Sequence, residues 1–376
     1  MKPGCYNSYM ESSIEALCHN YKTIQEYVGH KKSVVPILKC NAYGFGAVEA
    51  AKALIPMGAN LIAVAMVNEA VELRENGIDI PILVLGGVPT GSLTYAAEYG
   101  IQTIIFNKEN AQAINDAAKA LGKIADVQIK VNTGMNRVGV APGEKLDELL
   151  EYIQTLDNIN VVGTFTHFAT AKNINNPFTL QQYSDFKQAV AQIKAANKYD
   201  LKYIHCQNSN ATFWLEDDMC THVRPGAMLY GYYRLADGSK PLDLRETMSI
   251  RAYITAINDI PVGESVGYGR HFMPDKPARV ATVGMGYGDG LFRPHALNGG
   301  PVYVNDTLTN FVGICMDQLF VDVTNVDCKV GDEITILGYT KSGKLFSAFD
   351  VADSCSQPYQ IFVAVNTSRV GKVYKY

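Results

Sequence analysis

Residues 34–46 read VVPILKCNAYGFG, and this stretch decides the fold more than any other part of the chain. Its β-branched, apolar start is typical of a buried strand, which we expect over Val34–Lys39. Such a strand delivers the amine of Lys39 to its carboxyl end, where barrels and open sheets present reactive groups. A solvated lysine is the ordinary alternative. The following turn favours a functional amine, because Tyr43 and two glycines would let backbone N–H groups approach a phosphate closely.

Further short apolar runs follow at regular intervals and alternate with helix-length segments. They are Leu61–Ala65, Pro81–Leu85, Thr103–Ile105, Val127–Val131, Val161–His167, Tyr203–Cys206 and Met228–Tyr230. Together with the first run they make eight strands separated by helices, which predicts a (β/α)8 barrel of the TIM type. Lys39, His167, Asn208, Ser209 and Gly226 all lie near predicted strand ends, where a barrel places its active site.

The pattern changes from about residue 237, where glycine, proline and aspartate separate short strands. These strands are expected at Met248–Ile257, Arg279–Val283, Leu308–Ile314 and Glu333–Leu337, with little helical periodicity before Ala348. We therefore predict a barrel over residues 1–236 and a mostly β domain over residues 237–376. Ser12 and Glu15 form a capping-box pattern that predicts a helix before the first barrel strand. An N-terminal strand ahead of that helix could join the β domain.

Composition and charge exclude several classes of protein. The chain of 376 residues has 33 basic and 37 acidic residues and no run of five like charges, which argues against nucleic acid as a partner. No stretch approaches the roughly 18 apolar residues of a membrane span, and the N-terminus lacks a signal peptide. Eight scattered cysteines without a Cys-x-x-Cys pair predict thiols in a reducing cytoplasm. The cytoplasmic domain of a membrane-anchored protein would look the same.

Polar residues in the loops after the predicted strands are candidates for the functional site. Arg137 lies in a glycine-flanked loop after the fifth strand, and His167 ends the sixth, although a surface arginine and a structural histidine are the ordinary alternatives. Barrels commonly bind phosphate with the loops after strands seven and eight. Ser209 and the backbone at Gly226 and Ala227 are therefore candidate phosphate donors.

Two other motifs are less suited to chemistry. His205 and Cys206 are adjacent on a predicted strand, so their side chains point to opposite faces and cannot share one metal ion. We expect no metal site. In the β domain, Gly267-Tyr268-Gly269 and the stretch GMGYGDG at residues 284–290 lack the spacing of a dinucleotide fingerprint or a P-loop. Both predict tight turns that expose a tyrosine.

Six segments, taken in order, resemble the alanine racemase family. They are ILKCNAYGFG (37–46), NTGMNRVG (132–139), THFATA (166–171), RPG (224–226), GYG (267–269) and CMDQ (315–318), and they span nearly the whole chain. The resemblance implies an isomerase that converts L-alanine to D-alanine for cell-wall peptidoglycan. It implies pyridoxal 5′-phosphate held as a Schiff base on Lys39. It also implies a homodimer in which each active site borrows Tyr268 from the partner subunit.

The same resemblance assigns roles to individual residues. Lys39 and Tyr268 would be the two catalytic bases on opposite faces of the substrate, which is what racemisation needs. The residues implied to bind the cofactor are Tyr43, Asn208, Ser209, Gly226 and Ala227 around the phosphate, Arg224 at the pyridine nitrogen, His167 beside the ring and Arg137 at the phenolic oxygen. Arg137, Met316 and Asp317 would contact the substrate. Lys130 matches a position that is often carbamylated in the family.

Departures from the family pattern leave the substrate open. Gly313, Lys172 and Ser368 stand where relatives often carry an arginine, an acidic residue and a tyrosine. Loss of a tyrosine at Ser368, or at nearby Asn366, would leave room for serine, as in serine racemase domains of vancomycin-resistance proteins. More remote alternatives are a pyridoxal-phosphate-dependent amino-acid decarboxylase and a non-catalytic carrier of the cofactor.

Overall fold

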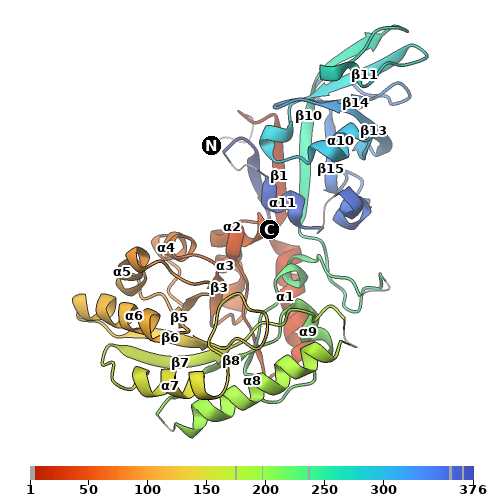
Figure 1. Ribbon diagram of the computed structural model, residues 1–376. Helices are drawn as coiled ribbons and strands as arrows, with labels where there is room; N and C mark the ends of the chain where they lie inside the picture. The colour runs from red at the N-terminus through yellow and green to blue at the C-terminus, as the bar shows by residue number, and fades with distance from the viewer. Residues whose placement is uncertain (1–4, 174–175, 197, 236–237, 355–357, 366–367) are drawn as a thin grey trace.

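An α/β barrel and a mostly β domain lie one above the other in the computed structural model (Figure 1). The structure describes residues 5–173, 176–196, 198–235, 238–354, 358–365 and 368–376. The predicted architecture, a (β/α)8 barrel followed by a β domain, is confirmed. The predicted boundary between residues 236 and 237 falls outside the described residues and stays a prediction.

Eight short parallel strands form the wall of the barrel. They are β2 (Ser33–Val34), β3 (Ile62–Val64), β4 (Ile82–Val84), β5 (Thr103–Ile105), β6 (Ala125–Lys130), β7 (Ile159–Phe165), β8 (Tyr203–His205) and β9 (His222–Val223). Hydrogen-bonded pairs join β2 to β9, β3 to β4, and β5 through β8 in sequence. Single parallel bridges, such as Ile37 to Ala63 and Leu83 to Gln102, connect the remaining neighbours. The described barrel strands therefore form a closed ring without an edge strand.

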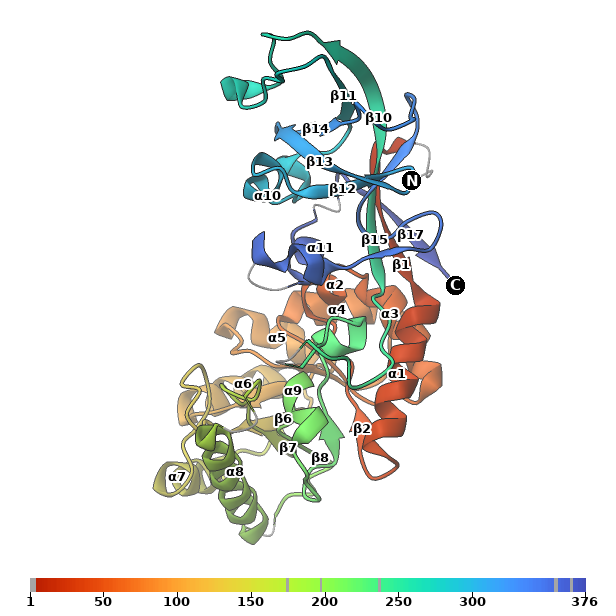
Figure 2. The same ribbon diagram turned by 90° about the vertical axis from the view of Figure 1, so that its right-hand side faces the viewer.

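Helices surround this wall on the outside (Figures 1 and 2). They are α1 (Ile14–Val28), α3 (Ala47–Leu54), α4 (Val67–Glu75), α5 (Thr90–Glu98), α6 (Lys108–Ala120), α7 (Glu144–Ile153), α8 (Pro177–Ala195) and α9 (Ser209–Trp214), with a short 3-10 turn η2 (Ile55–Met57) after α3. The predicted capping residue of α1 is wrong by one position. Ser13 is the N-cap, because its hydroxyl accepts from the Ala16 N–H at 3.1 Å. Ser12 instead donates to the Phe45 carbonyl at 3.0 Å.

The first and eighth barrel strands differ from their predicted positions. The strand expected at Met228–Tyr230 is wrong, since Ala227–Tyr230 forms the 3-10 helix η3 and the strand is β9. A short, fully apolar run does not show by periodicity whether it is strand or helix. Here Tyr230 is buried and its hydroxyl donates to the Ile37 carbonyl at 2.9 Å. The first strand is also shorter than expected, and Lys39 begins the helical turn α2 (Lys39–Tyr43) instead of ending the strand.

The β domain is built on one sheet of nine strands. They are β1 (Ser8–Ser13), β10 (Met248–Ile260), β11 (Ala278–Val283), β12 (Pro301–Val304), β13 (Thr307–Ile314), β14 (Leu319–Asp322), β15 (Glu333–Tyr339), β16 (Leu345–Phe346) and β17 (Gly371–Lys375). Their order is β16-β15-β12-β13-β14-β11-β10-β1-β17, and an extra pairing of β15 with β10 closes six of them into a ring. Short helical segments decorate it: η4 (Tyr268–Arg270), η5 (Tyr287–Asp289), α10 (Arg293–Leu297), η6 (Ala348–Ser354) and α11 (Gln360–Ala364).

The first and the last strands that the structure describes both lie in this sheet. β1 pairs antiparallel with β10 and parallel with β17, and it leads directly into α1 of the barrel. One apolar cluster runs through both parts, since it contains Leu17 of α1, Leu38 before α2 and Ile250 of β10. Because they share a packed core, the two parts hold a defined orientation.

The cysteines and the helix lengths bear on two predictions about the chain as a whole. All seven described cysteines are free thiols, while Cys355 lies outside the described residues. Among the helices that the structure describes, none is both long enough and apolar enough to cross a membrane.

Candidate active site

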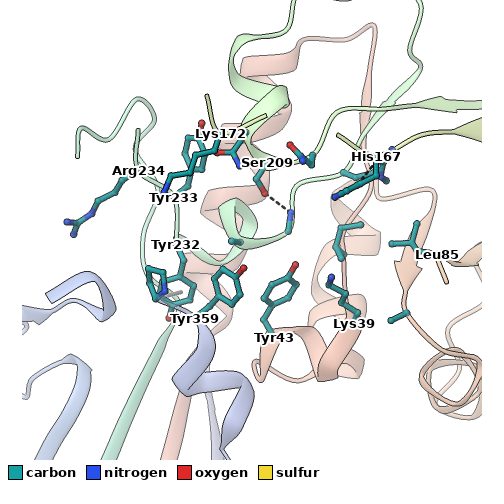
Figure 3. A pocket seen from close by; sticks show the side chains of 18 of the residues that line it. Lys39, Tyr43, Leu85, His167, Lys172, Ser209, Tyr232, Tyr233, Arg234 and Tyr359 are labelled. Carbon is teal, nitrogen blue, oxygen red and sulfur yellow. Dashed lines mark hydrogen bonds between the residues drawn. The ribbon is translucent and has the colours of Figure 1, made fainter. Parts of the chain in front are cut away.

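The α2 turn that carries Lys39 has a left-handed backbone. Cys40, Asn41, Ala42 and Tyr43 have φ angles of 53°, 51°, 55° and 57°. For residues with a side chain this conformation costs roughly 1–2 kcal/mol each, so neighbouring groups must hold it in place. The turn brings Lys39 and Tyr43 side by side, with the Lys39 amine 5.8 Å from the centre of the Tyr43 ring (Figure 3).

Two side chains secure the start of this turn. A carboxylate oxygen of Glu69, on α4, accepts from the Cys40 N–H at 2.5 Å, and its other oxygen accepts from the Ala65 N–H at 2.8 Å. The Asn41 side chain accepts from the Ala47 N–H at 2.8 Å and so connects the turn to α3. Hydrogen bonds of this kind offset the strain of the left-handed residues.

A cavity of about 540 Å³ opens at the carboxyl ends of the barrel strands, beside the β domain. Nine predicted site residues line it: Lys39, Tyr43, Arg137, His167, Asn208, Ser209, Arg224, Gly226 and Ala227. Figure 3 shows Lys39 and His167 toward one side and Tyr43 and Ser209 in the middle. The structure therefore gathers in one place residues that are up to 188 positions apart in the chain.

Tyr43, Ser209 and Gly226 make a small cradle of hydrogen-bonding groups. The Ser209 hydroxyl accepts from the Gly226 N–H at 2.9 Å, and a Cβ atom on Gly226 would lie 2.5 Å from the Tyr43 hydroxyl. Burial raises the pKa of Tyr43, so its hydroxyl stays protonated and can donate. Asn208 also lines the cavity, but its side chain caps α9 by accepting from the Ala211 N–H at 3.1 Å.

Arg224 occupies the centre of a buried network of nitrogen atoms. It donates from Nη1 to His205 Nδ1 at 2.7 Å and from Nη2 to the Thr166 carbonyl at 2.7 Å, and Nη2 lies 3.3 Å from His167 Nδ1. Burial lowers the pKa of Arg224 to about 10, which leaves it charged at neutral pH. Since a guanidinium only donates, both histidine nitrogens that face it are acceptors.

His205 holds Arg224 from behind, a role that the sequence did not reveal. Its Nδ1 accepts from Arg224, so its Nε2 carries the proton and donates to Gln128 Oε1 at 2.7 Å. Burial, and then the charge of Arg224, lower the pKa of His205 and of His167, which keeps both rings neutral. His205 ends β8 and Cys206 follows it, so their side chains face opposite sides of the barrel wall. His205 therefore lies inside the barrel against Phe165, while Cys206 packs in the apolar core outside the wall.

Lys130 is a buried amine among cations. Its side chain is only 3% exposed and its Nζ lies 4.5 Å from the centre of the Phe165 ring. Burial, then Arg224 and Arg137, lower the pKa of Lys130 well below its usual value. No carboxylate is found among the described residues that line the cavity, so the walls of the site are strongly cationic.

Three predicted site residues lie away from this cavity, on the surface of the β domain. Tyr268 is 84% exposed and Met316 is 61% exposed. Asp317 lines a separate pocket of about 430 Å³ that also contains Arg369. The prediction of turns that expose a tyrosine is confirmed, because Tyr268 in η4 and Tyr287 in η5 are both exposed. Within one chain, however, the structure does not bring Tyr268 to Lys39.

The expected loss of a tyrosine at Ser368 or Asn366 stays a prediction, although the cavity does contain a tyrosine from the C-terminal segment. Tyr359, just before α11, lines the cavity, and its ring meets that of Tyr43 edge-on at 5.3 Å. Ser368 is absent from the described lining, and Asn366 lies outside the described residues. Lys172 does line the cavity, whereas Gly313 packs near Phe320 in the β domain. No local motif marks Tyr359, because only the packing of the β domain on the barrel brings it to the site.

The cavity at the carboxyl ends of the barrel strands contains an amine, two hydroxyl groups and a buried guanidinium. This arrangement is typical of a barrel enzyme that binds an anionic ligand. The chain matches the family models of the alanine racemase N-terminal domain over residues 12–234 and C-terminal domain over residues 247–374. It therefore belongs to the alanine racemase family of amino-acid racemases, which are isomerases.

Individual relatives agree with this assignment. The alanine racemase of Clostridium novyi is 35% identical over 370 residues, which cover 97% of this chain and 95% of that protein. The solved alanine racemase of Clostridium difficile 630 superposes with a TM-score of 0.91 at 32% identity and covers 98% of this chain and 95% of its own. The histidine racemase of Leuconostoc mesenteroides superposes with a TM-score of 0.88 at 26% identity and covers 100% and 99%.

Proposed function

We propose that the protein interconverts L-alanine and D-alanine with pyridoxal 5′-phosphate as cofactor, and that D-alanine supplies cell-wall peptidoglycan. The observation that carries this proposal is the layout of the cavity. The Lys39 amine lies beside the hydroxyl cradle of Tyr43 and Ser209, and charged Arg224 lines the same space.

The residues present fit this cofactor. Gly226 leaves open the space next to the Tyr43 hydroxyl that a Cβ atom would fill, so a phosphate could approach the backbone there. Ser209, Tyr43 and the Gly226–Ala227 backbone would hold the phosphate, with Asn208 positioning α9 behind them. When joined to Lys39, the cofactor supplies a conjugated system that accepts the electron pair left as the α-proton departs.

Arg224, His167 and Arg137 would set the charge around the ring. Arg224 would donate to the pyridine nitrogen, and since an arginine keeps its proton at neutral pH, that nitrogen would stay unprotonated. His205 holds Arg224 in the required direction. Arg137 would face the phenolic oxygen of the cofactor and the carboxylate of the substrate.

Lys39 and Tyr268 would move the α-proton on opposite faces of the substrate. Because Tyr268 is exposed and is not among the described residues that line the cavity of its own chain, we propose a homodimer in which each subunit inserts Tyr268 into its partner's site. Met316 and Asp317 would accompany it. There, the Nε2–H of neutral His167 would donate to the phenolate oxygen of the partner subunit's Tyr268 and stabilise it as a base.

We also propose that Lys130 is carbamylated. Its burial among Arg224 and Arg137 favours a neutral amine, which can add carbon dioxide and release one proton to give an anionic carbamate. The carbamate would pair with Arg137 and lower the excess of positive charge. Carbon-13 NMR of protein prepared in labelled bicarbonate should show one carbamate signal that disappears in Lys130→Ala.

Alanine is favoured over serine because relatives that align over nearly the whole chain, such as the Clostridium novyi protein, are alanine racemases. Serine racemisation, as in vancomycin-resistance proteins, remains the second candidate, since a pocket for alanine rejects an added hydroxyl only weakly.

The deciding experiment incubates the purified protein separately with L-alanine and L-serine and follows optical rotation. We expect complete loss of rotation with alanine and slower loss with serine. A faster reaction with serine would favour the second candidate. Release of carbon dioxide would identify a decarboxylase, and a bound cofactor without turnover would identify a carrier; either result contradicts the proposal.

A further inference from the structure

The last strand of the chain reaches the turn that carries Tyr43. Lys372, on β17, is half-buried, and its amine donates a hydrogen bond to the carbonyl of Gly44. Gly44 is the residue that ends α2 and has a φ angle of 90°. Lys372 is not among the described residues that line the cavity, so it contacts the turn without contributing to the cavity wall.

Neighbouring residues of the C-terminal segment press on the same turn. A Cβ atom on Gly44 would collide with the Phe362 carbonyl, and one on Gly46 would collide with the Tyr374 hydroxyl. Tyr359 meets the ring of Tyr43 at 5.3 Å. Figure 2 shows α11 directly above α2. Residues of the C-terminal segment on both sides of the turn, from Tyr359 and α11 to β17, therefore pack against it.

These contacts of the C-terminal segment offset the conformational cost of the left-handed turn. Four consecutive left-handed residues cost several kcal/mol in total, by the roughly 1–2 kcal/mol for each, and they persist only where the surroundings favour them. Glu69 and Asn41 secure the start of the turn, while Lys372 binds its end. A hydrogen bond from a charged donor is stronger than one between neutral groups, so Lys372 supplies a strong side-chain hydrogen bond at that end.

We propose that Lys372 is a positioning residue for the cofactor phosphate. By holding the Gly44 carbonyl, it fixes the turn that presents the Tyr43 hydroxyl, so the β domain controls how tightly the barrel binds its cofactor. The inference rests on the proposed function, because the ligand of the Tyr43 cradle is taken to be pyridoxal 5′-phosphate.

The electrostatic surroundings of Lys372 are compatible with this role. Burial lowers the pKa of Lys372 to about 8, and Glu49 of α3 acts in the opposite direction. The neighbouring Tyr374 hydroxyl is neutral, because burial, followed by Glu49, raises its pKa. Lys372 is therefore mainly charged at pH 7, and an arginine in its place would stay charged and able to donate.

Titration of the apoprotein with pyridoxal 5′-phosphate, followed by visible absorbance, tests the proposal. We expect Lys372→Met to weaken cofactor binding about tenfold, which corresponds to the loss of one charged hydrogen bond. Lys372→Arg should bind within about threefold of the wild type. Lys375→Met is the matched control, since Lys375 lies on the same strand but is exposed, and it should bind as the wild type does.

Hydrogen exchange of the apoprotein gives a second readout that does not depend on the cofactor. The amides of residues 40–46 should exchange faster in Lys372→Met than in the wild type or in Lys375→Met. Unchanged affinity and unchanged exchange in Lys372→Met overturn the proposal. Should that variant fail to fold, Lys372→Leu, which also lacks a donor, takes its place under the same criteria. If the wild type itself binds no cofactor, the proposed function fails, and the exchange data still decide whether Lys372 holds the turn.

Discussion

Gly226 shows how one missing side chain shapes the candidate site. The residue has no left-handed φ angle, so the requirement for glycine comes from space and not from backbone strain. Its neighbour across the cradle is the Tyr43 hydroxyl, from a segment more than 180 positions earlier in the chain. The Arg-Pro-Gly motif was visible in the sequence, but the reason for its glycine was not.

We predict that Gly226→Ala weakens binding of pyridoxal 5′-phosphate at least tenfold. The added methyl group would lie 2.5 Å from the Tyr43 hydroxyl and displace it, at a cost of about 1–3 kcal/mol for overpacking. Equilibrium titration of the apoprotein measures the change. Gly91→Ala is the control, because a Cβ there meets nothing within 4 Å, and its binding should be normal. If Gly226→Ala binds the cofactor as tightly as the wild type, Gly226 is not part of the phosphate-binding cradle.

At the scale of elements, the site depends on how α2 is connected to α4. Glu69 lies in the first turn of α4 and accepts from backbone N–H groups of Cys40, Ala65 and Met66. One carboxylate thus joins the start of the left-handed turn to the loop after β3. The sequence predicted a strand up to Lys39, whereas in the structure Lys39 begins this turn, in which Glu69 accepts from the Cys40 N–H.

We predict that Glu69→Ala lowers the free energy of unfolding by about 1–3 kcal/mol, since the backbone N–H groups lose their acceptor. Denaturant titration of the apoprotein measures it. Glu72→Ala, on an exposed position of the same helix, should change stability by less than about 0.5 kcal/mol. If both substitutions lower the free energy of unfolding equally, Glu69 stabilises the protein only through the helix propensity or the charge of α4, and not through its hydrogen bonds to the turn.

At the scale of the whole molecule, the arrangement of the two parts leaves Tyr268 exposed on the β domain while Lys39 lies at the barrel mouth. The proposed two-base mechanism would then need a second copy of the chain to supply Tyr268. A two-fold dimer would supply this, because the same surface serves both subunits and completes two sites at once.

We predict that two inactive variants restore activity when mixed. Lys39→Ala and Tyr268→Phe should each lack racemase activity, but a mixed dimer contains one site with both native residues. If the subunits of an equal mixture exchange at random, half of the dimers contain one subunit of each variant. Each mixed dimer has one intact site out of two, so about a quarter of the wild-type activity should return. Alanine racemisation after joint refolding measures it, with each variant refolded alone as the control. A mixture as inactive as its parents contradicts sharing of residues between subunits.

The sequence by itself determined the barrel, the β domain and most of the candidate site. Strand and helix periodicities are local, and the residues that line the cavity lie in the loops just after the predicted strands, so neighbouring positions carry that information. Short apolar runs were the exception, as at Met228–Tyr230, because two or three residues do not distinguish a strand from a helical turn.

Only the tertiary structure decided which distant residues support the site. Tyr359 reaches the cavity, His205 holds Arg224, and Lys372 binds the Gly44 carbonyl across 328 positions of the chain. No periodicity or motif encodes such contacts, because they arise when the closed barrel and the β domain pack against each other through a shared apolar core.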